Sequence, residues 1–178
     1  IDVGDSLQNT SIGEGAGDAY TTGSRNTAVG YAALDANTTS NDNTGVGYNA
    51  LGANTASNNT AVGRDALASN TTGTQNDAVG AYALDANSTG NYNSAFGMNA
   101  LSANSTGSAN VAIGVQALYG NTTASNNTAV GYQALDQNTT GANNIAVGSQ
   151  ALGANTTGAS NVAVGYLALD AASTLSGI

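Results

Sequence analysis

The chain has 178 residues, among which there is no Cys, His, Pro or Trp, and its formal net charge is −9 because Arg25 and Arg64 are its only cations. Without thiol and imidazole groups the chain lacks the common nucleophile, the common general base and the soft metal ligands, so we expect neither an enzyme nor a bound cofactor or metal. The shortage of Lys and Arg also argues against binding to nucleic acid or to an anionic membrane surface, since both require cations that replace counterions.

Apolar residues make up 40% of the chain, and their regular spacing argues against the disorder that a composition rich in Gly, Asn, Ser and Thr would suggest. No run approaches the ~18 consecutive apolar residues of a membrane span, and no basic segment precedes an apolar one as in a secretory signal. Because the first residue is Ile1 rather than Met, we expect a processed product or a segment of a longer protein.

Residues 1–8 precede the first repeat, and we predict an N-terminal strand or junction there. The segment Ile1-Asp2-Val3-Gly4-Asp5 combines β-prone residues with two carboxylates. The open end of a solenoid is a template for strand addition, so we expect this end to be covered or joined to another domain or subunit.

Residues 9–170 consist of ten copies of one repeat, with the consensus N-T-A-V-G-x-x-A-L-x-x-N-T-T-G-x-x. The copies recur at a fixed period of ~17 residues, except that the step from Asn43 to Asn59 is one residue shorter. The deletion is predicted in the Thr55–Asn58 connection, because a one-residue slip within a strand would turn every side chain to the wrong face. Positions are numbered from the first Asn of each copy, which is Asn9, Asn26, Asn43, Asn59, Asn76, Asn93, Asn110, Asn127, Asn144 or Asn161.

This period predicts an all-β fold, a parallel β-solenoid of ten ~17-residue coils. A helical pattern cannot continue through Asn-Thr-Thr-Gly, whose residues are poor helix formers. Equivalent residues of stacked coils lie ~4.8 Å apart, so the ten copies would form a rod of roughly 48 Å. The first and last copies depart from the consensus, as the ends of a capped array do.

Positions 2–4, Thr-Ala-Val in most copies, are predicted to form the first strand of each coil. The Gly at position 5 recurs from Gly13 to Gly165 and is expected at a corner with positive φ or a close backbone approach. A second strand is predicted to run from the Ala-Leu pair at positions 8 and 9 toward a second Asn at position 12. A Gly in a left-handed turn is then expected to close the coil at Gly23, Gly73, Gly90, Gly107, Gly141 and Gly158.

Position 4 is apolar in every copy, whereas position 3 is always small. Adjacent strand residues face opposite sides, so one column lines a thin interior and the other still needs a cover. An apolar stripe along the whole rod exceeds what a soluble monomer exposes, which predicts a homo-oligomer, with a trimer as the simplest closed bundle. The predicted core or oligomer column is Ile12, Val29, Val46, Val62, Val79, Phe96, Ile113, Val130, Val147 and Val164.

The Asn column at position 1 is predicted to be an internal ladder in which each amide bonds its equivalents above and below, with contact to calcium or a ligand as the alternative. The Asn at position 12 precedes Thr or Ser and is typical of an Asx turn. Seven of its eight members also satisfy N-x-[ST], so glycosylation is the alternative interpretation. These eight are Asn37, Asn54, Asn70, Asn87, Asn104, Asn121, Asn138 and Asn155.

Position 6 varies between copies, which indicates an outward site. We interpret its tyrosines as partly covered surface residues, with stacking on a sugar ligand as the alternative. These possible ligand-facing residues are Tyr31, Tyr48, Tyr132 and Tyr166. Position 10 carries carboxylates that are expected to be solvated, with a row of Ca²⁺ ligands as the alternative. They are Asp35, Asp85, Asp136 and Asp170.

Residues 171–178 break the repeat and are predicted to be a C-terminal junction, because they contain no charged block, bulky cap or helix signal that would cover the last coil. We expect a connection either to another domain or to the next subunit of a filament.

Two copies carry a family resemblance: Asn127–Leu135 reads N-T-A-V-G-Y-Q-A-L, and Asn110–Leu118 reads N-V-A-I-G-V-Q-A-L. They resemble the N-x-[VA]-[AV]-[IV]-G-x-x-A head repeats of trimeric autotransporter adhesins of the YadA type, and similar repeats occur in phage tail fibres and related bacterial surface fibres. The resemblance covers about residues 9–170. It implies a left-handed parallel β-roll that is trimeric and binds host or matrix surfaces, although the period here is longer than is usual for those heads.

The sequence therefore predicts an adhesin-type fibre at the cell surface, in the extracellular space or on a virion, with a host surface, matrix or glycan receptor as partner. A self-assembling filament, or a shaft subunit of a phage tail fibre, is the first alternative. Ice binding is the second alternative, although the adjacent Thr of each Thr-Thr pair is expected to point the other way. Its Thr column is Thr38, Thr71, Thr122, Thr139 and Thr156.

Overall fold

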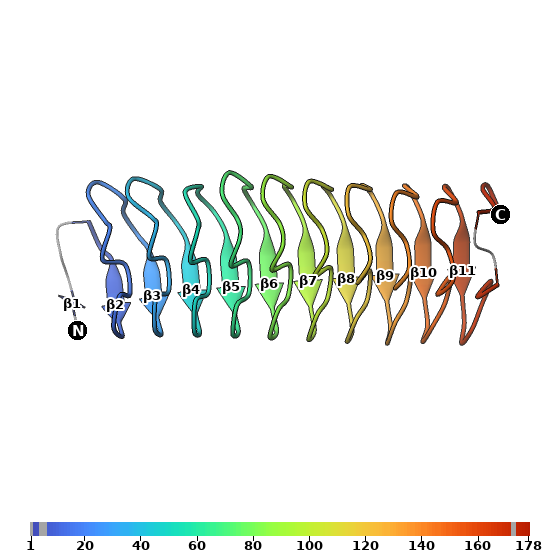
Figure 1. Cartoon of the computed structure of the whole chain (residues 1–178), viewed down its shortest axis with the longest axis horizontal. Coiled ribbons are helices and arrows are strands. Elements are labelled where there is room, and N and C mark those ends of the chain that lie inside the picture. Colours follow the sequence, from blue (N-terminus) through green and yellow to red (C-terminus); the bar gives the residue numbers. More distant parts are fainter. Residues whose placement is uncertain (1, 4–6, 172–173) are drawn as a thin grey trace.

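The protein is an elongated solenoid with its two ends at opposite ends of a rod (Figure 1), and the computed structural model describes residues 2–3, 7–171 and 174–178. Parallel strands β2 to β11 lie side by side along the rod in sequence order, so nine turns lead from β2 to β11. Hydrogen-bonded equivalents in neighbouring coils are 17 residues apart in the sequence, which confirms the predicted all-β parallel solenoid. The strands are β1 (Asp2–Val3), β2 (Thr10–Ile12), β3 (Thr27–Val29), β4 (Thr44–Val46), β5 (Thr60–Val62), β6 (Asp77–Val79), β7 (Ser94–Phe96), β8 (Val111–Ile113), β9 (Thr128–Val130), β10 (Ile145–Val147) and β11 (Val162–Val164).

Each repeat places positions 2–4 in one strand, and we number the coils 1 to 10 from the first Asn of each copy. All of β2 to β11 pair in register, including β4 with β5, where Val46 lies opposite Val62 despite the shortened step. The missing residue lies in the loop, since the Asn54 side-chain amide bonds the carbonyl of Ala56, two residues on, instead of three residues on as in other coils. The deletion thus falls within the predicted connection.

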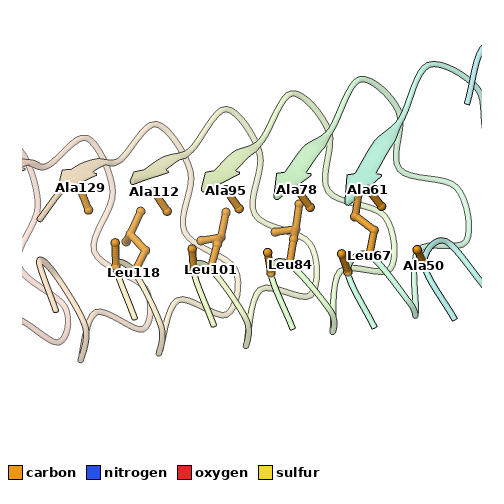
Figure 2. Close-up of a cluster of buried hydrophobic side chains, with 14 of the residues drawn as sticks. Ala50, Ala61, Leu67, Ala78, Leu84, Ala95, Leu101, Ala112, Leu118 and Ala129 are labelled. Carbon is orange, nitrogen blue, oxygen red and sulfur yellow. The ribbon is translucent and has the colours of Figure 1, made fainter. Parts of the chain in front are cut away.

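The interior of the rod is narrow and is filled by the Ala of position 3 and the Ala-Leu pair of positions 8 and 9. Figure 2 shows the strand alanines, such as Ala95 and Ala112, facing the leucines of the opposite side, such as Leu101 and Leu118. All four side chains are fully buried. Because the same buried Ala-Leu pair repeats in coils 2–9, one continuous apolar core runs along the rod axis.

The predicted second strand at the Ala-Leu pair is wrong, because this part of the coil is a series of turns. Non-glycine residues at positions 7 and 9 have left-handed backbone conformations, as at Ala32 (φ 52°) and Leu34 (φ 53°). Alternation of side chains between two faces holds only for extended backbone. The left-handed residues instead allow Ala33 and Leu34 to point into the same core.

The turns are nevertheless tied to neighbouring coils by backbone hydrogen bonds. The Leu34 N–H donates to the carbonyl of Ala50 in the next coil (3.0 Å), and the Ala32 N–H donates to that of Glu14 in the preceding coil (2.9 Å). A left-handed conformation costs a non-glycine residue about 1–2 kcal/mol. The backbone hydrogen bonds between stacked coils therefore offset this conformational cost, which recurs in every coil.

The Gly at position 5 meets both of its predicted requirements. At Gly131, φ is +138°, and a Cβ would lie 2.5 Å from the carbonyl oxygen of Gly148. The prediction for position 15 is wrong, because Gly141 and its equivalents do not have positive φ. The left-handed residue of this loop is at position 17, as at Asn126 and Asn143, and position 15 is instead a place of close backbone approach.

The two ends are built differently. At the N-terminal end β1 pairs antiparallel with β2. Coil 1 has Gly17 at position 9 in place of the core leucine, and the ring of Tyr20 fills the space that a side chain on Gly17 would occupy. At the other end, the Ile178 N–H donates to the side-chain oxygen of Asn161, 17 residues earlier (3.2 Å), so residues 174–178 keep the repeat register. Residues 1, 4–6 and 172–173 of the two predicted junctions lie outside the described part of the chain.

Candidate interaction surface

The position-1 asparagines are buried inside the rod, from Asn9 to Asn161. The Oδ1 of each accepts the backbone N–H of its equivalent in the next coil at 2.9–3.2 Å, as from Asn26 to Asn9 and from Ile178 to Asn161. In most coils the Nδ2 also donates across the interior to the carbonyl of position 15. These side chains therefore join successive coils and hold the two walls of each coil together.

The shortened coil breaks this pattern at one residue. The Nδ2 of Asn43 is buried and finds no hydrogen-bond acceptor in the protein. Its counterpart Asn110 lies in a full-length coil and bonds the carbonyl of Ala124 at 2.9 Å. Loss of one loop residue thus removes an acceptor from an amide that stays buried.

The asparagines of position 12, which were predicted to stabilise a turn, bond the backbone of that turn and also form a second interior ladder. The Nδ2 of Asn138, for example, donates to Oδ1 of Asn121 (3.0 Å) and to the carbonyl of Gly141 (2.9 Å). All of these amides are fully buried, and from Asn70 to Asn155 the Nδ2 of each donates two hydrogen bonds. Glycosylation at these N-x-[ST] motifs would have to modify a side-chain amide nitrogen that is buried inside the rod.

Sequence reasoning missed a third ladder, at position 16, which lies in the loop before each Asn. There the backbone N–H of one coil donates to the side-chain oxygen of the next, as from Asn91 to Ser108 (3.0 Å) and from Ser108 to Ser125 (2.9 Å). The only sequence signal is the recurrence of Ser, Asn and Thr at this position. Ala142 and Ala159 interrupt it.

The position-4 column faces outward and is no part of the core within one chain. Its members are half-buried or exposed, with values of 41% for Phe96, 43% for Ile113 and 70% for Val164 in the last coil. The Ala of position 3 supplies the inward face of the same strand. An apolar stripe therefore runs along the sheet, and no segment within the described part of the chain covers it.

The stripe widens toward the C-terminal end of the rod. In coils 6–10 positions 2, 4 and 6 hold no charged residue, and apolar side chains such as Met98, Val115 and Ile145 join the position-4 column. In coils 1–5 the same three positions carry Glu14, Arg64 and Asp77. The outward face of the sheet is thus divided into a charged half and an apolar half.

The position-6 tyrosines are exposed, and those of coils 2 and 3 belong to a stack of side chains that ends at Tyr82, a position-7 residue. Tyr31 and Tyr48 stack with centroids 5.2 Å apart and ring planes 10° from parallel. The Arg64 guanidinium then lies 5.7 Å from the Tyr48 centroid and 5.5 Å from that of Tyr82. Arg64 also donates to Asp65 at 3.0 Å. We call Tyr31, Tyr48, Arg64 and Tyr82 the aromatic stack.

Further along the same column, Tyr132 and Tyr166 lie two coils apart with Ser149 between them. Tyr132 is 51% exposed and Tyr166 is 73% exposed. Ser149, the position-6 residue of the intervening coil, is too small to stack on either ring. We call Tyr132, Ser149 and Tyr166 the tyrosine slot.

Among the position-10 carboxylates, Asp136 and Asp170 turn toward each other across Gly153. Their Oδ1 atoms lie 3.5 and 2.7 Å from the place where a Gly153 Cβ would be. Burial raises the pKa of Asp136, and the charge of Asp170 raises it further. By contrast, Asp85 accepts a hydrogen bond from Ser102 (2.6 Å), so the column does not act as one row of free ligands.

Both members of each Thr-Thr pair lie on the surface, contrary to the expectation that they point in opposite directions. Thr71 and Thr72 are both exposed. The Thr71 hydroxyl donates to the carbonyl of Ser88 in the next coil (2.9 Å), and equivalent bonds recur along position 13. The outer Thr of position 14 is left exposed at the surface in nine coils, from Thr22 to Thr174.

No group of three or more His, Cys, Asp or Glu gathers at one point within residues 2–3, 7–171 and 174–178. A hollow of about 310 Å³ lies at the first coil, against residues that include Leu7, Asn9, Asp18 and Tyr20. In the same part of the chain no helix has the length and hydropathy of a membrane span. No family model, curated protein or solved structure matches this chain.

Proposed function

We propose that this chain is the rod of a fibre at the cell surface, in the extracellular space or on a virion, and that three copies pack along their sheets to form it. The observation that carries the proposal is the uncovered apolar stripe of position 4, which runs from Ile12 to Val164. A soluble monomer rarely leaves so continuous an apolar surface in water. A three-fold bundle covers the stripe of every copy with one kind of contact.

The size of this face suits a stable association. The ten parallel strands extend over about 48 Å, and positions 2 to 4 span about 10 Å of each strand, so the face measures on the order of 500 Å² in projection. Stable interfaces bury about 800 Å² on each partner. The face is thus of the right order to be one side of an interface.

The division of the face into a charged and an apolar half favours parallel copies in register. Antiparallel packing would bring Glu14, Arg64 and Asp77 of one copy against the apolar coils 6–10 of another. Burying the carboxylates of Glu14 and Asp77 against an apolar partner costs several kcal/mol. Parallel packing places apolar coils against apolar coils and leaves the charges at one end.

Attachment to a host surface, matrix or glycan receptor is the activity that we propose for the fibre, and the left-handed sense of the β-roll is part of the same proposal. It is supported by the resemblance of the N-x-A-V-G-x-x-A-L core to adhesin heads. A second support is that position 6 varies freely while exposed, as Tyr48, Met98 and Val115 illustrate. A glycan array and immobilised matrix proteins would reveal the receptor class, and absence of binding to every surface would leave a purely structural fibre.

Light scattering tests the association, with an expected mass of about three times 17.2 kDa. Val130→Asp should dissociate the assembly, because it places a charge in the covered stripe. Since Val130 faces outward, the separated chain should keep its β-sheet circular dichroism. Thr140→Asp, at an exposed place in the loop, is the control and should leave the mass unchanged. A soluble chain of 17.2 kDa before any substitution would contradict the proposal.

Disulfide trapping tests the direction of packing, because the chain has no cysteine of its own. Val46→Cys and Val130→Cys lie in coils 3 and 8, which would meet in an antiparallel pair. Parallel copies should form disulfides only between identical variants. Crosslinks confined to a mixture of the two variants would show antiparallel packing.

A filament of rods stacked end to end, such as a tail-fibre shaft, is the alternative favoured by the last coil. There Val164 and Tyr166 are 70% and 73% exposed, and Ile178 leaves a coil in register but incomplete. Negative-stain images should then show long filaments, which deletion of residues 171–178 shortens. Short rods before and after the deletion would exclude this alternative.

Ice binding is supported by one observation, the exposed Thr column of position 14, which includes Thr72, Thr106 and Thr140. Stacked coils would place these hydroxyl and methyl groups about 4.8 Å apart. Thermal hysteresis of the purified chain tests this alternative, and its absence would exclude it.

A further inference from the structure

Inside the rod, the leucine of position 9 in one coil contacts position 3 of the following coil. The Cγ and Cδ1 atoms of Leu34, in coil 2, lie 3.3 and 3.6 Å from the place where a Cβ on Gly45 of coil 3 would be. The same stacking of leucines on strand residues repeats along the core (Figure 2), and the leucines of coils 2–9 are fully buried. Each of these leucines is therefore seated partly on its own coil and partly on the next one.

The hollow at the first coil lies where coil 1 would receive the leucine of a preceding coil. Ser11 stands at position 3 of coil 1, which is the position that such a leucine contacts elsewhere in the rod. The hollow has a volume of about 310 Å³, and its lining includes the interior residues Asn9, Ser11, Ala16 and Gly17. Coil 1 thus offers the second half of a leucine seat.

The last coil presents the side chain that fits this seat. Leu169 stands at position 9 of coil 10 and is 39% exposed, whereas its equivalents in coils 2–9 are fully buried. Among the strands of the described chain, β11 has only β10 as a neighbour. Coils 1 and 10 lie at opposite ends of the rod (Figure 1), so a chain cannot place Leu169 in its own hollow.

Strand β1 occupies the edge on which a preceding coil would stack. It pairs antiparallel with β2, and Asp2 lies opposite Ser11 while Val3 lies opposite Thr10. A coil stacked before coil 1 would place its own parallel strand on this edge, as each coil does for the next. Because an unpaired strand edge is a template for joining another chain, β1 protects β2 from such joining. Its pairing covers two residues, whereas β8 and β9 pair over three, so few contacts hold it in place.

We propose that the N-terminal end of the rod binds the C-terminal end of a second copy of this chain, with Leu169 of that copy in the hollow of coil 1, and that β1 blocks this contact until it is displaced. A second copy is the partner because the contact repeats the one that already joins neighbouring coils. The contact rests on the end-to-end alternative proposed above. It does not depend on the three-fold bundle, because every single chain has both ends.

Rod length in negative-stain images tests the proposal, because joining of ends changes the length, whereas packing side by side changes only the thickness. The complete chain should form rods of one length. Deletion of residues 1–6 removes β1 and should at least double the mean length. Leu169→Asp in the deleted chain should restore the single length, because a carboxylate is costly in an apolar interior. Thr140→Asp adds the same charge in an exposed loop far from either end, and should leave the long rods intact.

A disulfide tests the seat itself, since the chain has no cysteine. Ser11→Cys and Leu169→Cys combined in the deleted chain should give a ladder of linked chains on a non-reducing gel, because the two positions of one chain lie at opposite ends of the rod (Figure 1). Each single variant should give dimers at most.

Four results would overturn the proposal. They are single-length rods of the deleted chain, long rods that persist with Leu169→Asp, no species beyond a dimer from the double variant, and long rods of the complete chain. The last result would leave the end-to-end alternative standing but remove the role of β1. Absence of a three-fold bundle would change the mass and thickness of the rods without changing these lengths. Circular dichroism of the same samples checks that each variant keeps its β-sheet.

Discussion

At the scale of single residues, the two glycine columns differ in what they require. Gly131, at position 5, combines φ of +138° with a backbone carbonyl 2.5 Å from where a Cβ would stand. Gly141, at position 15, has no positive φ, and Ser40 and Ala124 occupy the same position in other coils. Position 5 therefore excludes a side chain, whereas position 15 accommodates a small one by small shifts.

Gly131→Ala should therefore lower the free energy of unfolding by at least about 2 kcal/mol, because it adds left-handed strain to a clash with the next coil. Gly141→Ala, the matched control, should cost clearly less. Urea unfolding followed by circular dichroism measures both. Equal losses in the two variants would contradict the distinction drawn here.

The carboxylate of Asp136 makes stability depend on pH. Because burial raises its pKa, the folded chain holds this proton more tightly than the unfolded chain does. The resulting stabilisation is complete below the ordinary value of 3.8 and is lost as the pH rises through the higher, folded-state pKa.

Asp136→Asn should consequently raise the melting temperature at neutral pH and have little effect below a pH of about 3. Asp35→Asn removes an exposed carboxylate from the same column and serves as the control for net charge. Thermal unfolding at both pH values measures the difference. A gain that is the same at both pH values would show that the charge of Asp136 is not its cause.

At the scale of the coil, the shortened copy leaves a buried amide without an acceptor. Inserting one Thr after Thr55 changes the loop from N-T-A-S-N to N-T-T-A-S-N, which is the sequence of coil 7 from Asn121 to Asn126. There the carbonyl of Ala124 accepts a hydrogen bond from the side-chain amide of Asn110.

This insertion should stabilise the rod by about 1–3 kcal/mol, because Asn43 regains its acceptor, while one extra loop residue costs little entropy. The same insertion after Thr122 in coil 7 lengthens a complete loop and should not stabilise. Thermal melts of both insertions check the result, and equal effects would rule out the Asn43 explanation.

The position-16 ladder can be extended in the same way. Ala142 has no side-chain oxygen to accept the backbone N–H of Ser125. Ala142→Ser should supply one, as Ser125 does for Ser108, and add about 0.5–1.5 kcal/mol to stability. Ala86→Ser, at an exposed place outside the ladder, is the control. A melting temperature that rises no more than in this control would argue against the predicted bond.

At the scale of the whole molecule, hydrogen-bonded side-chain columns and an apolar core hold the coils together. No group of three or more carboxylates gathers among the described residues. Removing divalent metal with a chelator should therefore leave the melting temperature and the β-sheet circular dichroism unchanged. A fall in either would identify a calcium site, and Asp136 and Asp170 would be the first residues to test.

The sequence alone determined the features that depend on periodicity. The constant step between copies predicted the stacked coils, and the extended Thr-Ala-Val segment predicted which side of the strand faces inward. The Gly of position 5 predicted the corner, since no other residue tolerates both its φ and its contact. The shortened step located the deletion in the loop, because register must hold within the strand.

The tertiary structure decided the path of the chain beyond that corner. Sequence reasoning assumed extended backbone at Ala33 and Leu34, but left-handed residues turn both side chains into one core. Ala, Leu and Gln carry no local signal for that conformation, which is stabilised by backbone bonds between neighbouring coils. For the same reason, only the stacked structure showed that Asn138 faces inward and that Arg64 lies between two tyrosine rings. Contacts between coils, which a single repeat does not contain, determine the orientation of these side chains.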